Sequence, residues 1–240
     1  PAISGTRGTE DIAALLAPFK NVHIVSGHTH HNNTMVVSDN LIEHNIGAVC
    51  ECWWWSGKYS GRGICADGSP AGYSVFEING SDIEWYYKGT SCERSEQFRT
   101  YDMNVVKNYL NDYVDILNRQ TEPIRDTGGN DYGDLRDNTV YINVWDYDPL
   151  WTISVTENGT PLKVKSVYDR DPLHTICYDI LRIQNGGDLN GSNASIRNSH
   201  MFSVQASSAN SSLDITVTNR FGKTYTERMT RPKAYNIQMK

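Results

Sequence analysis

The chain has 240 residues, with 22 Lys and Arg against 28 Asp and Glu, and therefore a formal net charge of −6. This acidic balance argues against a nucleic-acid-binding protein, because such proteins carry clustered positive charge. Hydrophobic residues make up 38% of the chain and aromatic residues 10%, which excludes an intrinsically disordered composition. No apolar run reaches the roughly 18 residues of a membrane span, so we expect a folded, aromatic-rich protein of two modest domains.

The first elements have the order helix, strand and polar loop. Residues 9–19 place apolar side chains at helical spacing, with Thr9 as a cap and acidic residues in the first turn. Residues 21–26 form a short β-branched run that predicts a buried strand, and the histidine-rich segment 27–31 follows it directly. Ligands of α/β proteins bind at the carboxyl ends of strands, so this segment is a candidate site.

Further short strands are expected at 34–37 and 47–52. Two more, at 73–78 and 83–88, are joined by an Asn-Gly pair, which is typical of a β-hairpin. The N-terminal part of the chain is therefore predicted to combine one helix with several strands.

The pattern changes after about residue 95. Apolar spacing predicts a connecting helix over 103–118, and the polar segment 119–137 resembles a linker. The strands expected beyond it are 139–144, 151–156, 161–167, 174–180, 200–206, 212–218 and 223–229. Seven short strands separated by turn residues predict a β-sandwich of immunoglobulin-like type, with the Gly-, Asn- and Ser-rich stretch 185–199 as a long loop.

The five cysteines do not have the spacing of a metal finger. Cys50 and Cys52 alternate along a predicted strand, so their side chains are expected on opposite faces. We interpret the cysteines mainly as small buried hydrophobic residues. A disulfide from Cys65 to Cys50 or Cys52 is the alternative if the protein is exported.

Three of the seven histidines occupy positions 28, 30 and 31. Neutral imidazoles bind divalent ions, and two of them one residue apart can reach separate ions of a close pair. Gly27 is expected to let the backbone turn and approach such a site closely. The alternative is a polar loop that contains histidines without binding a metal.

The segment Gly27-His28-Thr29-His30 resembles the last metal-ligand motif, Gly-His-x-His, of the calcineurin-like metallophosphoesterases. Residues 48–57, with their three tryptophans, and 67–73, with Asp-Gly-Ser-Pro, resemble the phosphoesterases of Bacteroidetes-type bacteria. Three later segments are similar to the C-terminal β-domain of those proteins: 141–146, 171–175 and 229–234. The resemblance thus covers nearly the whole chain, as the C-terminal portion of a longer protein.

This resemblance implies an α+β, mostly β fold. Residues 1–97 would form the C-terminal part of a phosphoesterase β-sandwich with a flanking helix, and residues 98–240 an immunoglobulin-like accessory β-sandwich. The implied activity is hydrolysis of a phosphate mono- or diester by two divalent ions (Mn, Fe or Zn), with His28 and His30 each binding one ion. The implied location is exported, in the periplasm or at the bacterial cell surface.

The sequence departs from that family before Gly27. The remaining ligand motifs, Asp-x-His, Gly-Asp-x-x-Asp and Gly-Asn-His, do not occur there, and the chain begins at Pro1 without an initiator methionine or signal peptide. We therefore expect a processed or cut piece, inactive alone, with an incomplete metal site and no catalytic residue of its own. Strands left without partners are expected to self-associate or to lose order near the N-terminus.

Four other residues are candidates for substrate binding. His31 and Asn32 follow the metal motif directly. Trp54 is the middle one of three consecutive tryptophans, which are otherwise expected in the core. Asp67 is the fourth candidate, although an aspartate that stabilises a turn is the better-supported alternative.

The second half contains further acidic and histidine residues to which we assign no site. The pairs Asp146/Asp148 and Asp169/Asp171 lack the glycine and distal glutamate of a calcium loop, so they are expected to be solvated turn residues. His174 and His200 are predicted on strands, in the core or at the surface.

Two other functions remain open. The first is a secreted, aromatic-rich β-sandwich that binds a carbohydrate or a protein partner without catalysis. An exposed strip of Trp or Tyr side chains, and saccharide binding that survives chelation, would favour it. The second is a β-sandwich that only packs against the catalytic domain and stabilises it.

Overall fold

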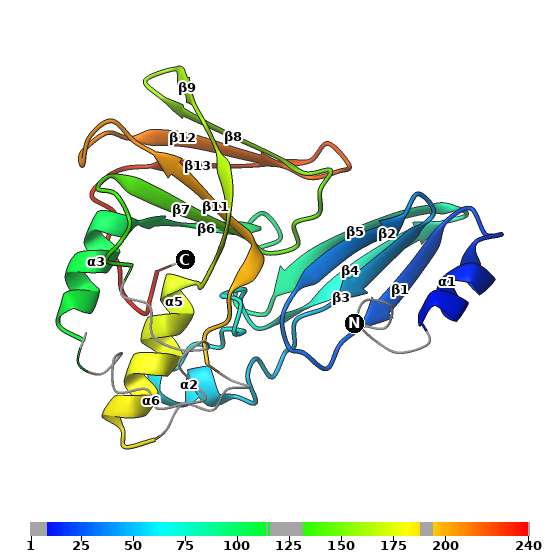
Figure 1. Cartoon of the computed structure of the whole chain (residues 1–240), viewed down its shortest axis with the longest axis horizontal. Helices are drawn as coiled ribbons and strands as arrows, with labels where there is room; N and C mark the ends of the chain where they lie inside the picture. Colours follow the sequence, from blue (N-terminus) through cyan, green and yellow to red (C-terminus); the bar gives the residue numbers. More distant parts are fainter. Residues whose placement is uncertain (1–8, 114, 116–131, 188–193, 240) are drawn as a thin grey trace.

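A computed structural model describes residues 9–113, 115, 132–187 and 194–239 (Figure 1). The described chain is mostly β, with a smaller N-terminal sheet, a long hairpin, and a β-sandwich covered by helices on one face. None of the helices in these ranges is long and apolar enough to cross a membrane.

The N-terminal part consists of one helix and a three-stranded sheet. Its elements are α1 (Thr9–Leu16), β1 (Val22–Ser26), β2 (Asn33–Ser38) and β3 (Leu41–Asn45). The strand order is β1-β3-β2, with β1 parallel and β2 antiparallel to β3. β1 is therefore an edge strand among the described elements, and the histidine-rich loop follows its carboxyl end.

A long hairpin packs beside this sheet (Figure 1). It consists of β4 (Gly72–Asn79) and β5 (Asp82–Gly89), and Gly80 in its turn has a positive φ of 63°. Trp85 of β5 contacts the rings of His23 and His44 at centroid distances of 5.2 and 4.7 Å. Aromatic packing thus joins the hairpin to the sheet.

The C-terminal part is a sandwich of two four-stranded antiparallel sheets. The first has the order β10-β11-β7-β6 and the second β13-β12-β8-β9. The bounds are β6 (Phe98–Asp102), β7 (Thr139–Val144), β8 (Thr152–Glu157), β9 (Thr160–Leu162), β10 (Lys165–Asp169), β11 (Asn198–Gln205), β12 (Leu213–Thr218) and β13 (Thr224–Met229). Buried side chains of both sheets, such as Ile142, Val204 and Ile215, form one core between them.

A second core covers the other face of the first sheet. It is formed with α3 (Met103–Asn111) and with a helical segment made of α5 (Pro172–His174), the π-helix η2 (Thr175–Ile180) and α6 (Leu181–Gln184). The short helix α2 (Trp55–Ser60) contacts η2 and α6. The sequence-based expectation of a mostly β protein with a β-sandwich is confirmed.

Most predicted elements are confirmed within one to three residues. They are the first helix, the strands of β1, β2, β7, β8, β11, β12 and β13, and the Asn-Gly hairpin. The expected strand 161–167 is divided between β9 and β10, and the helix expected over 103–118 is α3, whose described part ends at Asn111. Residues 114 and 116–118 of the expected helix, 119–131 of the expected linker and 188–193 of the expected long loop lie outside the described residues. The immunoglobulin-like topology and the domain boundary at residue 97 stay predictions.

The strand predicted at 174–180 is wrong, because this segment is helical. Asp171 caps it by accepting a hydrogen bond from the backbone N–H of His174 at 3.0 Å, and Pro172 occupies the first turn. Every residue from Thr175 to Ile180 is buried, including the polar Thr175 and Asp179, so the segment has no solvent-exposed face. A short run that is buried throughout does not show the periodicity that distinguishes a helix from a strand.

The strand predicted at 47–52 is also wrong, and the neighbouring strand β3 was missed. The segment forms turns, and Glu51 has a positive φ of 48°. Cys50 and Cys52 therefore do not alternate along a strand. All five cysteines are free thiols and all except Cys50 are buried, which agrees with their interpretation as small buried residues and contradicts the disulfide alternative.

The acidic residues expected in solvated turns are mostly buried, which corrects that prediction. Asp146, Asp148 and Asp171 are 5%, 0% and 0% exposed. Asp148 pairs with the guanidinium group of Arg220 at 2.8 Å, and Asp171 accepts hydrogen bonds from Tyr101 and Asn143. A buried carboxylate needs such partners, and they come from segments that are distant in the sequence.

Candidate metal centre

The candidate site is the loop between β1 and β2, at the carboxyl end of β1. Two of its histidines, His28 and His30, have positive φ angles of 76° and 60°. Their side chains differ in exposure, since His28 is exposed and His30 is half-buried. The structure thus places both predicted ligands in one tight turn at the sheet edge, as expected of a ligand-binding loop.

The hydrogen bond of His30 leaves its Nε2 available to a metal ion. Its Nδ1 lies 2.6 Å from the backbone carbonyl oxygen of Glu51. A carbonyl only accepts hydrogen bonds, so Nδ1 carries the proton and the lone pair is on Nε2. Metal-binding histidines commonly orient their second nitrogen through such a hydrogen bond, and His30 therefore fits a divalent ion at Nε2.

His31 has the same local arrangement. Its Nδ1 lies 3.1 Å from the carbonyl oxygen of Thr29, which again leaves the lone pair on Nε2. The side chain of Asn45 holds the loop in place by donating to the carbonyl oxygen of His31 at 2.8 Å and to the hydroxyl of Thr29.

Backbone strain is concentrated around this loop. The described residues include eight non-glycine residues with positive φ, and five of them are His28, His30, Glu51, Trp53 and Trp54. Such conformations cost free energy and are common in functional loops. By contrast, Gly27 does not have a positive φ, and a Cβ atom there would meet nothing within 4 Å. The expectation that Gly27 provides the turn is therefore not supported.

Trp53 is the aromatic neighbour of His30. Their ring centroids are 4.6 Å apart, and Trp53 is 53% exposed. The sequence interpretation selected Trp54, which is 67% exposed and precedes α2. The three adjacent tryptophans were the signal in the sequence that marked this segment. The left-handed backbone conformations that bring Trp53 to His30 have no such signal, so the sequence did not select Trp53.

Glu51 is a further residue that sequence reasoning missed. Its carboxylate accepts hydrogen bonds from the backbone N–H groups of Gly57 and Ile64, at 3.0 and 3.3 Å. Burial raises the pKa of Glu51 to about 7 despite these hydrogen bonds. Glu51 thus fixes the turn whose carbonyl oxygen orients His30.

Asn32 and Asp67 connect the loop to the rest of the molecule. Asp67 accepts a hydrogen bond from the backbone N–H of Asn32 at 2.7 Å, and the Asn32 side chain bonds to Ser69 and to the backbone of Gly47. Asn32 and Asp67 are both buried, at 3% and 0% exposure. Asp67 also accepts from the backbone N–H and hydroxyl of Ser69, which favours the turn-stabilising alternative.

The β-sandwich supplies the other partners of Asp67. His200 of β11 lies 3.3 Å from its carboxylate, and Asn143 of β7 donates to its backbone carbonyl oxygen at 2.8 Å. Burial alone would raise the pKa of Asp67, but the hydrogen bond and charge of His200, the charge of His31 and the Ser69 hydroxyl lower it to about 2. Asp67 is therefore an ionised link between the sandwich and the histidine loop.

Gly68 allows the same segment to approach the sandwich closely. Its φ is +83°, and a Cβ atom there would lie 1.9 Å from the carboxyl carbon of Asp171. Its carbonyl oxygen accepts a hydrogen bond from the buried guanidinium group of Arg99 at 2.7 Å. The Asp-Gly-Ser-Pro segment, residues 67–70, is thus the place where the N-terminal part contacts the sandwich, and we call it the Asp67 junction.

The described residues do not include a group of three or more His, Cys, Asp and Glu side chains arranged to hold an ion. A dinuclear centre needs more ligands than two imidazoles. His28 and His30 can therefore provide only part of such a site.

Comparison with protein families gives one match. The family model described as the C terminal of calcineurin-like phosphoesterase matches residues 43–225. The match begins in β3 and extends into β13, so it includes the Asp67 junction and most of the sandwich. Comparisons with curated proteins and with solved structures gave no match.

Proposed function

The chain belongs to the family of C-terminal regions of calcineurin-like phosphoesterases, and from this premise we propose that it completes a dinuclear phosphoesterase site. In this proposal His28 and His30 each bind one divalent ion, and the parent protein hydrolyses a phosphate mono- or diester. The observation that carries the proposal is the hydrogen bond from His30 Nδ1 to the Glu51 carbonyl oxygen, which directs the lone pair to Nε2.

The chain's own residues orient the ligands and the substrate. The Glu51 carbonyl oxygen fixes the His30 ring, while the Asn45 amide donates to the Thr29 hydroxyl and to the His31 carbonyl oxygen. His31 and Asn32 are proposed to line the substrate side, and Trp53 and Trp54 offer exposed aromatic surface beside it. When bound, Mn, Fe or Zn ions neutralise the phosphoryl oxygens and activate water.

The β-sandwich acts in this proposal as a brace for the loop. The Asp67 junction ties Asn32 to His200 and Asn143 through buried hydrogen bonds. A second contact joins the regions, because Phe221 between β12 and β13 packs edge-on against Trp85 at 4.8 Å. Buried polar networks of this kind fix one arrangement of the parts they join.

The remaining ligands are proposed to come from the rest of the catalytic domain in a longer protein. The edge strand β1 and the exposed apolar side chains of Leu15, Phe19 and Val25 support this. Such surface is typical of an interaction site. When that part is missing, we expect self-association, which sedimentation at increasing concentration would detect. Export to the periplasm or cell surface belongs to the same proposal.

The test uses the longest protein encoded by the reading frame that contains this chain. His28→Ala and His30→Ala should each weaken metal binding by at least about 100-fold. Each should also reduce the rate of hydrolysis of bis(p-nitrophenyl) phosphate and p-nitrophenyl phosphate by at least about 100-fold. His31→Ala is the matched control, because it should raise KM while the metal content stays unchanged. Full metal content and activity in both ligand variants would overturn the proposal.

A further inference from the structure

Two exposed tryptophans follow the turn that orients His30. Trp53 and Trp54 are 53% and 67% exposed, although tryptophan side chains are on average largely buried in folded proteins. The ring of Trp53 contacts that of His30, at a centroid distance of 4.6 Å and an interplanar angle of 39°. An indole with much of its surface in solvent therefore lies directly beside a proposed metal ligand.

The backbone holds Trp53 in this position. Its φ is 61°, a conformation that is strained for a bulky side chain and that is found at functional loops. The turn is closed by two hydrogen bonds, from the N–H of Trp54 to the carbonyl oxygen of Cys50 at 2.7 Å and from the N–H of Trp55 to that of Cys52 at 3.1 Å. The turn thus presents the indole at the histidine loop before any ligand binds.

Trp55 provides a contrast within the same segment. It is half-buried, and the cationic groups of Lys58 and Arg182 lie 4.6 and 4.1 Å from its ring centroids. The Trp55 ring is therefore used in cation–π contacts inside the protein. Trp53 instead leaves about half of its surface to solvent, and its ring is available to a ligand.

The polar side chains of the loop region favour a flat aromatic ring over a sugar. Sugar hydroxyls need hydrogen-bonding side chains, but two amides of this region are already bonded within the protein. Asn32 bonds to Ser69 and to the backbone of Gly47, and Asn45 donates twice to the histidine loop. An aromatic ring needs only the face of the indole, and such stacking strengthens binding by about tenfold or more.

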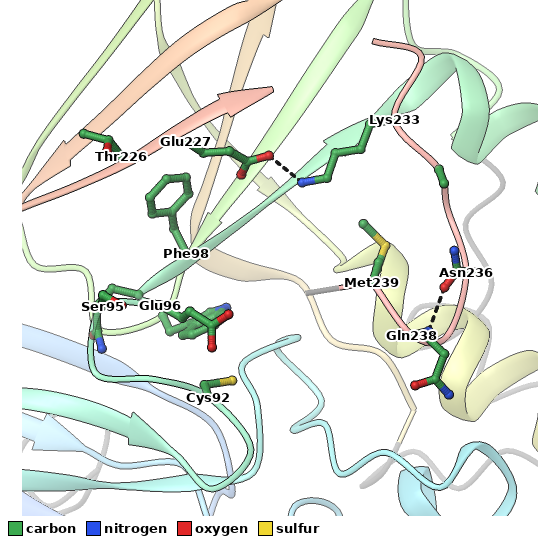
Figure 2. Close-up of a pocket in the computed structure, with 13 residues that line it drawn as sticks. Cys92, Ser95, Glu96, Phe98, Thr226, Glu227, Lys233, Asn236, Gln238 and Met239 are labelled. Carbon is green, nitrogen blue, oxygen red and sulfur yellow. Dashed lines mark hydrogen bonds and ion pairs between the residues drawn. The ribbon is translucent and has the colours of Figure 1, made fainter. Parts of the chain in front are cut away.

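The cavity between β6 and β13 is a separate place in the molecule (Figure 2). It has a volume of about 590 Å³, and neither His30 nor Trp53 is among its lining residues. Its Lys233 ammonium group is paired with the carboxylate of Glu227 at 2.6 Å, so this cation is not free to bind phosphoryl oxygens. The organic part of a phosphoester bound at the histidine loop is therefore expected at Trp53 and not in this cavity.

We propose that Trp53 selects phosphoesters with an aromatic ring close to the phosphorus atom, by stacking on that ring. The inference rests on the proposed function of the histidine loop and names its substrate class. The ring must be close to phosphorus because Trp53 contacts His30 directly, so a ring at the end of a long chain would pass beyond the indole.

The test compares the binding of three non-hydrolysable probes by isothermal titration calorimetry. They are phenylphosphonate, methylphosphonate and cyclohexylphosphonate, and the protein is the longest one encoded by this reading frame, loaded with Mn²⁺. Phenylphosphonate should bind at least about tenfold more tightly than methylphosphonate. The saturated cyclohexyl ring has a similar size and should lack most of this advantage. Equal affinity for the phenyl and methyl probes, or for the phenyl and cyclohexyl probes, overturns the proposal.

Variants of Trp53 link the preference to its indole. Trp53→Asn removes the ring and keeps a residue type that tolerates a positive φ, so the ratio of phenyl to methyl affinity should fall to near one. Trp53→Phe keeps an aromatic ring and should retain part of the preference. Tyr168→Asn is the control, at a 70% exposed aromatic residue of the sandwich, and should retain all of it. If Trp53→Asn does not fold, Trp53→Gly replaces it, and an undiminished preference in either folded variant contradicts the proposal.

The proposed function and this inference fail in different ways. If the protein binds metal and methylphosphonate but has no preference for phenylphosphonate, only the aromatic selectivity is wrong. If no phosphonate binds and His30→Ala leaves the bound metal unchanged, the phosphoesterase assignment is wrong and the selectivity of Trp53 with it.

Discussion

The N-terminal part and the β-sandwich differ in how completely they bury their apolar side chains. Among the described residues, eleven large hydrophobic side chains before residue 90 are exposed, whereas the sandwich exposes two, Leu150 and Tyr168. Both large cores belong mainly to the sandwich and its helices. The sandwich thus buries nearly all of its large apolar side chains, whereas the N-terminal part, which carries the candidate metal ligands, leaves many exposed and is the part for which we propose an interface.

The junction between the two parts is polar, and removing its central charge should have the largest effect. Asp67→Ala removes a buried carboxylate that accepts from Asn32, Ser69 and His200. We expect the free energy of unfolding to fall by about 3–5 kcal/mol, because the partners are left buried and unpaired. Urea unfolding would measure it.

The matched control for this variant is Asp82→Ala at the exposed start of β5, with an expected change within about 0.5 kcal/mol. Limited proteolysis adds a structural readout, because only Asp67→Ala should release the sandwich from the N-terminal part. A similar loss of stability in both variants would show that the hydrogen bonds of the Asp67 junction do not contribute more to stability than an exposed carboxylate does.

Two leucines test the difference in packing directly. Leu110 of α3 is fully buried in the second core, whereas Leu15 of α1 is 74% exposed. Leu110→Ala should lower the unfolding free energy by about 2–5 kcal/mol. Leu15→Ala should change it by no more than about 0.5 kcal/mol in this chain.

In a longer protein that covers α1, the same Leu15→Ala change should become destabilising. An unchanged Leu15→Ala effect in that protein would contradict the interface assigned to the N-terminal part. Differential scanning calorimetry of both leucine variants in both proteins would provide the comparison.

Two histidines of the N-terminal sheet, the half-buried His23 of β1 and the buried His44 of β3, should make the molecule sensitive to acid. His23 Nδ1 and His44 Nε2 are 2.9 Å apart, and burial, with the charges of His23 and Arg220, lowers the pKa of His44 to about 3. Between pH 6.5 and 3 the unfolded chain therefore binds a proton that the folded chain does not, and stability falls as the pH falls.

We expect a loss of about 2 kcal/mol between pH 7.5 and 4.5 from this histidine. In His44→Phe a phenyl ring replaces the imidazole and can keep the aromatic contacts with Phe76 and Trp85. The acid-induced loss of unfolding free energy should therefore be smaller in this variant. Urea unfolding at both pH values decides the question, and an equal acid sensitivity in the variant would exclude His44 as its source.

Asp146 should have an effect of opposite sign. Its carboxylate accepts from the hydroxyl of Thr34 in β2 at 3.3 Å, and burial, with the charge of Asp148, raises its pKa to about 7. The folded chain keeps this proton when the unfolded chain has lost it, so stability falls as the pH rises from 4 to 7. Asp146→Asn should therefore raise the unfolding free energy at pH 8 by about 2–4 kcal/mol, and no gain in urea unfolding at that pH would contradict this.

The sequence predicted most of the sandwich strands, although not β6, because Gly, Asn and Asp mark their turns. The Asn79-Gly80 hairpin of the N-terminal part was predicted for the same reason. It did not predict the helix after Asp171, because the segment is buried on every side and so lacks the alternation of apolar and exposed polar positions that marks a surface helix. At the site, the histidine motif was visible, whereas the link from His30 to Glu51 depends on left-handed turns at Glu51 and Trp53 that local sequence does not encode. The junction at Asp67 joins residues more than 70 positions apart and requires the folded chain.

The most direct test of the central claim is to locate the metal ions by anomalous X-ray scattering. Crystals of the longest protein encoded by this reading frame, grown with Mn²⁺ or Zn²⁺, would provide the data. We predict two ions, one bound to His28 and the other to Nε2 of His30, at about 2.0–2.2 Å from each nitrogen. Ions bound elsewhere, with both imidazoles free, would contradict the assignment of this loop to a dinuclear phosphoesterase site.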